Sequence, residues 1–425
     1  MKKFVALLLA LTLCIGLCAC GAQPEAPAAT DAPAATDAPA EETPAATGET
    51  EATTGSKDIK VGFIFLHDEN STYDLNFINA AKAACAEVGL SDDQVMMKTN
   101  ISESQACYDA AAELVDAGCD LIITDSFGHE SFALAAAKEF PEVHFVSCTG
   151  VKAHTEGLSN FHNAFASIYE GRYLAGVAAG LKLNEMIENG DITAEEAKMG
   201  YVGAFPYAEV KSGYTSFFLG ARSVCPSVTM EVTFTSSWYD EALEKEAANK
   251  LINNGCVLIS QHADSMGAPT ACETAGVPNV SYNGSTVAAC PNTFIVSSRI
   301  DWTPFFVYAI NCVASGEDIG YDWTGTLATG SVVLTDVNEQ AAAAGTAEKI
   351  AEVMKALEDG SVKVFDTATF TVNGETVTTY LADVDDLGDY VGETEAISDG
   401  VFLESYYRSA PYFDLDIDGI TNLDA

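Results

Sequence analysis

Aromatic and neutral hydrogen-bonding residues recur in this chain directly after short apolar runs. Ring faces can stack on a flat ligand, and hydroxyl, amide and carboxyl groups can recognise the polar rim of a heterocycle. We therefore predict a binding site for a flat, polar-edged heterocycle. The candidate binding residues are Tyr73, Asp74, Ser126, Phe127, Phe205, Trp238, His262, Asp264, Asn283 and Trp302.

Helix capping is a competing explanation for some of these polar residues. Asp68, Ser126 and Asp240 lie in loops before predicted helices, where short polar side chains often cap the first turn. Capping and binding both stay open for them. Capping does not explain loop aromatics such as Tyr73 and Trp238, for which we favour binding.

Catalytic patterns are weak in this chain. Its six histidines are scattered, and HExxH, GxSxG, P-loop and helix-opening GxGxxG patterns are absent. His262 and Asp264 could support acid–base work, but no nucleophile accompanies them. We expect no enzyme and no cofactor. A metal-binding receptor that uses His67, His129 and His262 stays an alternative, although the aromatic content favours an organic ligand.

The amino-acid composition limits the kinds of partner that the protein can bind. Twenty Lys and Arg against 62 Asp and Glu give a formal net charge of −42, which repels phosphate backbones and excludes nucleic acid as a partner. The nine cysteines after Cys20 show neither a disulfide framework nor a CxxC metal pattern. We expect small buried hydrophobic side chains at these positions, and we expect a monomer.

Two groups of alternating apolar and helical segments must position the candidate residues. This alternation is typical of doubly wound parallel sheets, in which ligands lie outside the carboxyl ends of the strands. Two such groups, joined near residues 160–167, predict two α/β lobes. The predicted strands are 60–66, 94–98, 121–125, 143–148, 199–205, 229–234, 257–261 and 279–282, and the predicted helices are 77–88, 102–117, 131–139, 168–186, 210–224, 240–253 and 268–275.

The first 57 residues contain targeting signals and a linker. Lys2 and Lys3 precede an apolar run that is too short for an ordinary membrane span, and the run ends in Leu17-Cys18-Ala19-Cys20. We predict a lipoprotein signal peptide at 1–20, with Cys20 as the lipidated residue. Residues 21–57 are rich in Ala, Pro, Thr and Glu, and we predict a disordered linker there.

Several motifs resemble one known family when they are taken together. Glu170-Gly171-Arg172-Tyr173-Leu174-Ala175-Gly176 is similar to its Glu-Gly-aromatic-Leu-Ala-Gly helix. Lys198–Phe205, Trp238-Tyr239-Asp240, Gln261–Ser265 and Gly325-Thr326-Leu327 match in the same order. Over residues 59–365 the chain resembles the basic membrane protein (BMP) family.

This resemblance implies a fold, a function and partners. The family comprises lipoprotein substrate-binding components of ABC importers with the type I periplasmic-binding-protein fold, so the implied partners are permease and ATPase subunits on the extracytoplasmic face of the cell membrane. That fold has three hinge crossovers, which we place near Asn163, Asn283 and Asp301. The corresponding bounds are 58–163 with 284–300 for the first lobe, and 164–283 with 301–360 for the second. Residues 361–425 form an acidic extension, for which we predict a hairpin around Asn373-Gly374 that packs on one lobe.

The resemblance also suggests a ligand. In the nucleoside-binding branch of the family, an Asp and a Lys resemble a clamp on ribose hydroxyls, and these positions fall on Asn283 and Ser298 here. The loss of both charges favours a free purine-like base over a nucleoside. A membrane-anchored sensor, or a receptor for another small heterocycle, stays an alternative.

Overall fold

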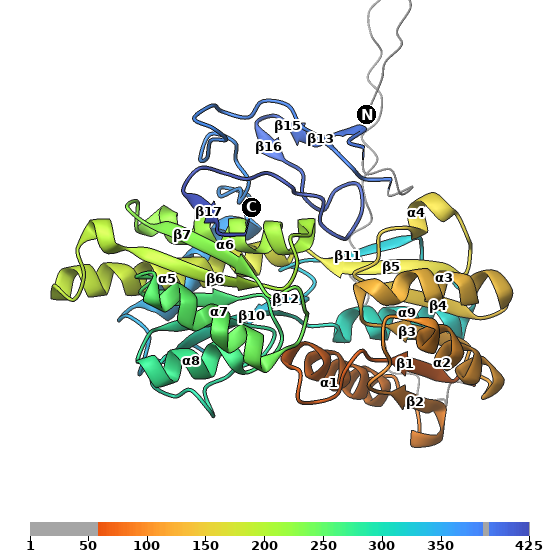
Figure 1. The fold of residues 1–425 in the computed structure, drawn as a ribbon. Coiled ribbons are helices and arrows are strands. Elements are labelled where there is room, and N and C mark those ends of the chain that lie inside the picture. The colour runs from red at the N-terminus through yellow and green to blue at the C-terminus, as the bar shows by residue number, and fades with distance from the viewer. Residues whose placement is uncertain (1–57, 386–390, 425) are drawn as a thin grey trace, which may run out of the picture. The chain divides into compact units, whose positions relative to one another are not determined.

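The computed structural model describes residues 58–385 and 391–424, which form two α/β lobes and a C-terminal extension (Figure 1). The predicted signal peptide, Cys20 and the predicted linker lie outside the described residues. The nine described cysteines are all free and buried, which confirms the prediction that they act as small hydrophobic side chains.

The first lobe is built on a six-stranded parallel sheet with the order β11-β5-β4-β3-β1-β2. Its apolar strands are buried because helices cover both faces. Its strands are β1 (Val61–Ile64), β2 (Val95–Lys98), β3 (Leu121–Thr124), β4 (His144–Cys148), β5 (Phe161–Ala166) and β11 (Asp322–Gly325). Its helices are α1 (Thr72–Glu87), α2 (Gln105–Asp116), α3 (Glu130–Glu139), α4 (Ala153–Glu156) and α9 (Thr303–Ser315).

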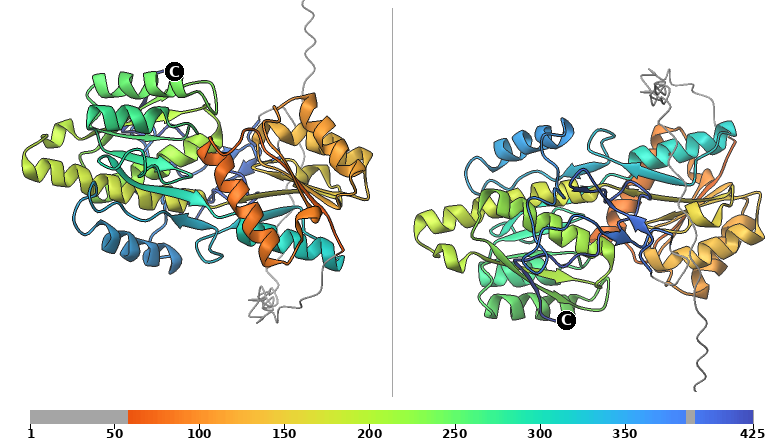
Figure 2. Two further views of the ribbon diagram at one scale, coloured as in Figure 1. Left: turned by 90° about the horizontal axis from the view of Figure 1, so that it is seen from below. Right: turned by 90° about the horizontal axis from the view of Figure 1, so that it is seen from above.

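The second lobe is built on a seven-stranded sheet with the order β12-β10-β9-β8-β6-β7-β17, in which β12 alone pairs antiparallel. Figure 2 shows this lobe beside the first from two further directions. Its strands are β6 (Lys198–Gly203), β7 (Thr229–Phe234), β8 (Leu258–Gln261), β9 (Asn279–Tyr282), β10 (Phe294–Ile300), β12 (Val332–Leu334) and β17 (Ile420–Asn422). Its helices are α5 (Ile168–Asn189), α6 (Ala208–Val224), α7 (Glu241–Asn253), α8 (Gly267–Ala275) and α10 (Thr346–Glu358).

The chain passes between the two sheets three times, and one of the three predicted crossovers is wrong. The first passage follows β5 and the second follows β10, close to the predicted Asp301. No passage occurs at Asn283, because β9 and β10 are parallel neighbours in one sheet. The third passage instead joins β11 to β12.

These passages correct the predicted lobe boundaries. Residues 294–300 belong to the second lobe, where β10 pairs with β9 and β12. Helix α9 belongs to the first lobe, since Phe305 and Phe306 are fully buried in a core that also contains Phe77. An apolar helix pattern shows that one face is buried, but it does not show which lobe covers that face.

The extension from residue 361 packs mainly on the second lobe. Phe365, Phe402 and Phe413 join the core under α5 and α6, and β17 extends the sheet beside β7. The predicted turn at Asn373-Gly374 is present, with both residues at positive φ and a bridge from Val372 to Glu375. The flanking runs do not pair as long strands. The regular pairs are β13 (Leu381–Ala382) with β14 (Thr394–Glu395) and β15 (Ile397–Ser398) with β16 (Val401–Phe402).

Candidate functional site

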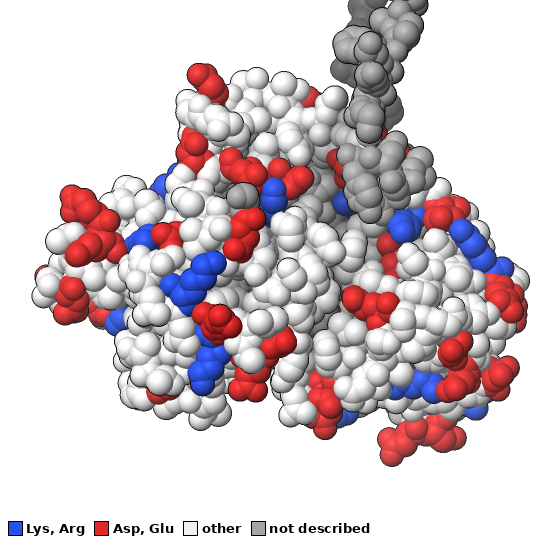
Figure 3. All heavy atoms as spheres, in the orientation of Figure 1, with Lys and Arg blue, Asp and Glu red and all other residues white. Residues whose placement is uncertain are grey.

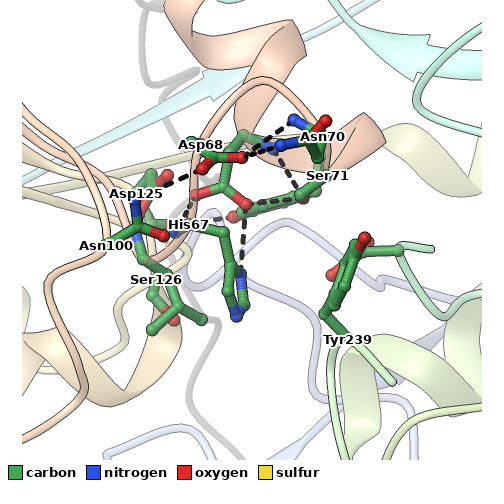
Figure 4. A network of polar contacts seen from close by, with 12 residues as sticks. His67, Asp68, Asn70, Ser71, Asn100, Asp125, Ser126 and Tyr239 are labelled. Atoms are coloured by element: carbon green, nitrogen blue, oxygen red, sulfur yellow. Dashed lines mark hydrogen bonds and ion pairs between the residues drawn. The ribbon is translucent and has the colours of Figure 1, made fainter. Parts of the chain in front are cut away.

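The loop after β1 holds a buried carboxylate at the start of α1. Ser71 caps this helix by accepting a hydrogen bond from the Asp74 amide. The Asp74 carboxylate accepts hydrogen bonds from the His67 amide at 2.7 Å and from the Ser71 hydroxyl at 2.6 Å (Figure 4). Burial raises the pKa of Asp74, but hydrogen bonds from His67, Asp125 and Ser71 outweigh it and leave the pKa below its usual value. Asp74 therefore holds the loop between β1 and α1 in place through its hydrogen bonds.

Asp125, at the end of β3, lies against Asp74 and is almost fully buried. Burial, followed by the nearby charge of Asp74, raises its pKa well above the usual value. The Asp125 side chain accepts a hydrogen bond from the Leu66 amide, and its backbone carbonyl accepts one from the Tyr73 hydroxyl at 2.5 Å. These bonds join the loops after β1 and β3, so Tyr73 is held with its ring at the edge of the cleft.

A cavity of about 20 Å³ lies between the two lobes at these strand ends. We call it the inner pocket. Strand-end loops of both sheets supply most of its walls, as expected for doubly wound sheets. Its lining residues are Leu66, Tyr73, Ser126, Phe127, Thr149, Glu209, Trp238, His262, Asp264 and Tyr282.

Six of the ten predicted binding residues line the inner pocket: Tyr73, Ser126, Phe127, Trp238, His262 and Asp264. Two others support a lining residue without reaching the cavity. Asn283 donates a hydrogen bond to the Asp264 carboxyl over 3.4 Å. The ring of Phe205 packs edge-on against Trp238, with centroids 5.1 Å apart.

Trp302 is not placed at the pocket, and this corrects its prediction as a binding residue. It is 1% exposed and stacks on Phe77, with centroids 4.4 Å apart. Phe165 and Phe306 surround it in the core of the first lobe. Trp302 therefore stabilises the second passage between the lobes by packing.

Asp264 places a buried carboxyl group at the inner pocket. Burial, followed by the charges of Asp74, Glu244 and Glu209, raises its pKa well above the usual value. A neutral carboxyl can donate one hydrogen bond and accept others. Its backbone carbonyl accepts hydrogen bonds from the amide and hydroxyl of Thr72, each at 3.1 Å, and these bonds join the two lobes.

His262 lies two residues before Asp264 in the same loop of the second lobe and is almost fully buried. Its Nε2 is 3.3 Å from Glu209 Oε1, and its Nδ1 is 3.3 Å from the Tyr201 hydroxyl. Burial lowers the pKa of His262, although the Glu209 carboxylate acts in the other direction. Behind it, the buried Arg172 donates to Tyr201 and to the carbonyl of Gln261.

The inner pocket is also lined by Thr149, Tyr282 and Glu209, which were not among the predicted binding residues. The sequence marks these three residues to different degrees. Thr149 directly follows β4, so the strand-end rule would have found it. Tyr282 is the last residue of β9 and its ring lies 4.7 Å from that of His262. Glu209 is in the first turn of α6, and no pattern in the sequence marks it.

The other polar candidates have structural partners. Asp240 caps α7 by accepting from the Leu243 amide, and Asp68 accepts from the Asn70 amide in its own loop. Ser126 does not cap a helix with its side chain and instead donates to Glu103 at 2.6 Å. Capping therefore explains Asp240.

The histidines of the alternative metal site do not converge. Within residues 58–385 and 391–424, the one group of three side chains close enough to hold an ion is Asp383, Asp385 and Glu393 in the extension. His67 lies beside Asp74, and its ring is 5.3 Å from that of Tyr239 in the second lobe (Figure 4).

Acidic side chains are spread over both lobes on the face in Figure 3, with fewer basic ones between them. This distribution matches the net charge of −42. No single basic patch is evident on that face.

Comparison with known proteins identifies the family. The family model of PnrA-like ABC transporter substrate-binding proteins, Bmp, matches residues 65–364. This chain belongs to the Bmp family. The predicted resemblance is thereby confirmed, and a Bmp protein is a substrate-binding component of an ABC importer that works outside the cytoplasm.

Two curated proteins and one solved structure are similar to this Bmp protein. A putative ABC transporter glucose-binding protein of Haloferax volcanii is 29% identical over 70% of the chain and 75% of that protein. A purine-binding protein of Brucella abortus is 30% identical over 62% of the chain and 71% of that protein. An ABC transporter solute-binding protein of Aeropyrum pernix K1 superposes with a TM-score of 0.62 at 17% identity, covering 75% of this chain and 94% of that one. The last similarity confirms the type I fold.

Among the described residues, no helix is long and apolar enough to cross a membrane.

Proposed function

We propose that this Bmp protein binds a neutral, planar heterocycle of the purine class between its lobes and delivers it to an ABC permease. The observation that carries the proposal is the composition of the inner pocket. Tyr73 and Phe127 come from the first lobe and Trp238 from the second, so rings from both lobes can enclose a flat ligand.

Hydrogen-bonding groups at the pocket suit the rim of such a ligand. Asp264 and Ser126 lie among the rings, and Asn283 orients the Asp264 carboxyl. A neutral Asp264 can pair with a ring nitrogen and with an adjacent N–H group of the same base. The purine-binding protein of Brucella abortus supports this ligand class.

A free base is preferred to a nucleoside in this proposal. Asn283 pairs with Asp264, and Ser298 is fully buried within β10, away from the inner pocket. Neither position supplies a charged group to hold ribose hydroxyls.

The ligand enters only when the lobes separate. A space of about 20 Å³ holds little more than one water molecule, so a base requires the walls to move apart. The walls belong to different lobes, which the three passages connect, and rotation of the lobes about these passages opens the cleft.

We further propose that Cys20 anchors the protein to the membrane and that the protein acts as a monomer.

A sugar is the second candidate ligand, because the similar protein of Haloferax volcanii is described as glucose-binding. Carboxyl groups beside aromatic rings, such as Asp264 beside Trp238, also suit a sugar ring. Mass spectrometry of small molecules released by denaturing the purified protein separates the candidates. A released purine base supports the proposal, whereas a released hexose replaces it with the second candidate.

A further inference from the structure

A second, larger cavity adjoins the inner pocket, and the extension forms much of its wall. Its volume is about 390 Å³, and it shares Phe127, Thr149 and Glu209 with the inner pocket. We call it the outer chamber. The residues contributed by the extension are Tyr380, Leu381, Asp383, Gly392, Arg408, Ala410, Pro411, Tyr412 and Asp414.

The extension is attached to one lobe and touches the other (Figures 1 and 2). On the second lobe, Lys211 pairs with Asp414 at 2.7 Å and Ser212 donates to Glu404. On the first lobe, the Ser409 amide donates to the Asp322 carboxylate at 3.1 Å. The extension therefore covers the cleft from the second lobe. The Bmp family match ends at residue 364, so this wall lies outside the matched region.

The charges of the outer chamber favour a cation. Its acidic groups are Glu209, Asp383 and Asp414, and Asp414 is already paired with Lys211. Its one basic lining residue, Arg408, donates its N–H groups to the backbone carbonyls of Ala410, Val384 and Pro411. A ligand group in the chamber therefore meets more carboxylates than cations.

The aromatic rings of the chamber favour the same ligand group. Tyr207, Tyr380 and Tyr412 line it together with Phe127. Aromatic faces attract ammonium groups, most strongly where water is excluded. Rings and carboxylates together are suited to an amine.

Thr149 marks the junction of the two cavities. It lines both, is 3% exposed, and its hydroxyl has no hydrogen-bond partner within the described residues. Its φ of 65° lies in the left-handed region, which is strained for a β-branched residue. A buried hydroxyl without a partner is costly, so a ligand that passes this point gains by pairing with it.

We propose that the outer chamber binds an ammonium-bearing arm of the ligand, whose heterocycle occupies the inner pocket. This inference rests on the proposed function and deepens it. Thr149 hydrogen-bonds the ligand where the arm leaves the ring. Glu209 and Asp383 attract the ammonium group, and the tyrosines enclose it.

Titration calorimetry with matched ligands tests the inference. The probes are adenine, adenine with a propyl arm and adenine with a 3-aminopropyl arm, each arm being attached at N6 in one series and at N9 in the other. In one series the aminopropyl compound is expected to bind about tenfold more tightly than the propyl compound, as for one added charge-assisted contact. This advantage falls as salt concentration rises.

Two variants test whether the preference for the amine arises in the outer chamber. Asp383→Asn lowers the preference for the amine, and Ala410→Leu weakens both armed compounds by filling the chamber. The matched control Asp191→Asn removes an exposed charge outside both cavities and leaves the preference unchanged. Thermal unfolding verifies that each variant is folded.

The outcomes separate the two proposals. If adenine binds but the amine gives no advantage over propyl in either series, the outer chamber inference is wrong and the proposed function stands. If none of the adenine probes binds, the inference fails, and the purine assignment fails with it when guanine and hypoxanthine do not bind either.

Discussion

At the scale of single residues, the pocket depends on carboxyl groups whose environments differ. Asp74 receives hydrogen bonds from its own loop and has a lowered pKa, whereas Asp264 is buried among other carboxylates and has a raised one. The environments therefore shift the same side-chain type toward its charged form in one place and toward its neutral form in the other.

Asp264 provides the first prediction. Asp264→Ala should weaken purine binding by about 1–3 kcal/mol, because a polar group of the ligand is left unpaired. Asp264→Asn should retain more of the affinity, since an amide is also neutral and can donate and accept. Titration calorimetry on both variants checks this. Equal losses in the two variants would show that the carboxyl group acts as an anion.

The residue scale also shows what the sequence could predict about the site. Tyr73, Ser126, Trp238 and Asp264 follow parallel strands, whose carboxyl ends meet at one edge of a sheet whatever the details of packing. Glu209 could not be found in this way, because it reaches the pocket through the orientation of α6. Trp302 follows a strand equally closely, but packing against Phe77 turns its ring into the core.

At the scale of elements, alternation of apolar and helical segments predicts both sheets and most of their members. The lobe to which β10 and α9 belong was not predictable, because it depends on long-range pairing with β9 and on packing against α1. The extension has little regular structure, so its place over the cleft left no periodic signal. Only the Asn373-Gly374 turn, a local feature, was foreseen.

Glu404 provides a prediction at the element scale, since it joins the extension to α6 through Ser212. Burial raises its pKa from an ordinary 4.5 to about 7. The folded protein therefore holds a proton on Glu404 between these pH values, whereas the unfolded chain loses it. The free energy of unfolding contributed by this group is present below pH 4.5 and falls as pH rises toward 7.

Chemical denaturation of wild type and Glu404→Gln between pH 4.5 and 7.5 checks this effect. Relative to the variant, which does not titrate there, the wild type should lose up to about 3 kcal/mol as pH rises. A difference between the two proteins that stays constant with pH would contradict a raised pKa for Glu404.

At the scale of the whole molecule, the pocket and the three passages together indicate a hinged receptor. Small-angle scattering should show a smaller radius of gyration with saturating ligand than without it, because the ligand joins both lobes. Trp238→Ala at the same ligand concentration is the control and should close less. An unchanged radius in the wild type at saturation would rule out hinge closure.

Attachment to the membrane is a separate property of the whole chain. Cys20→Ser should release the protein from the membrane fraction, because the predicted lipid anchor is lost. Cys18→Ser is the matched control and should leave the protein attached. If Cys18→Ser releases it and Cys20→Ser does not, the lipidated residue is Cys18.

The central claim is that a planar purine-like base binds between Tyr73, Phe127 and Trp238. Titration calorimetry of the wild type and Trp238→Ala with adenine, guanine, hypoxanthine, their nucleosides and glucose tests it most directly, with Tyr321→Ala as the control for loss of an exposed ring. We predict that at least one free base binds more tightly than its nucleoside and than glucose. We also predict that Trp238→Ala weakens this binding by about 1–3 kcal/mol, as for the loss of base–aromatic stacking, while Tyr321→Ala leaves it unchanged. Binding of glucose but of no purine, or purine binding that is insensitive to Trp238→Ala, would contradict the claim.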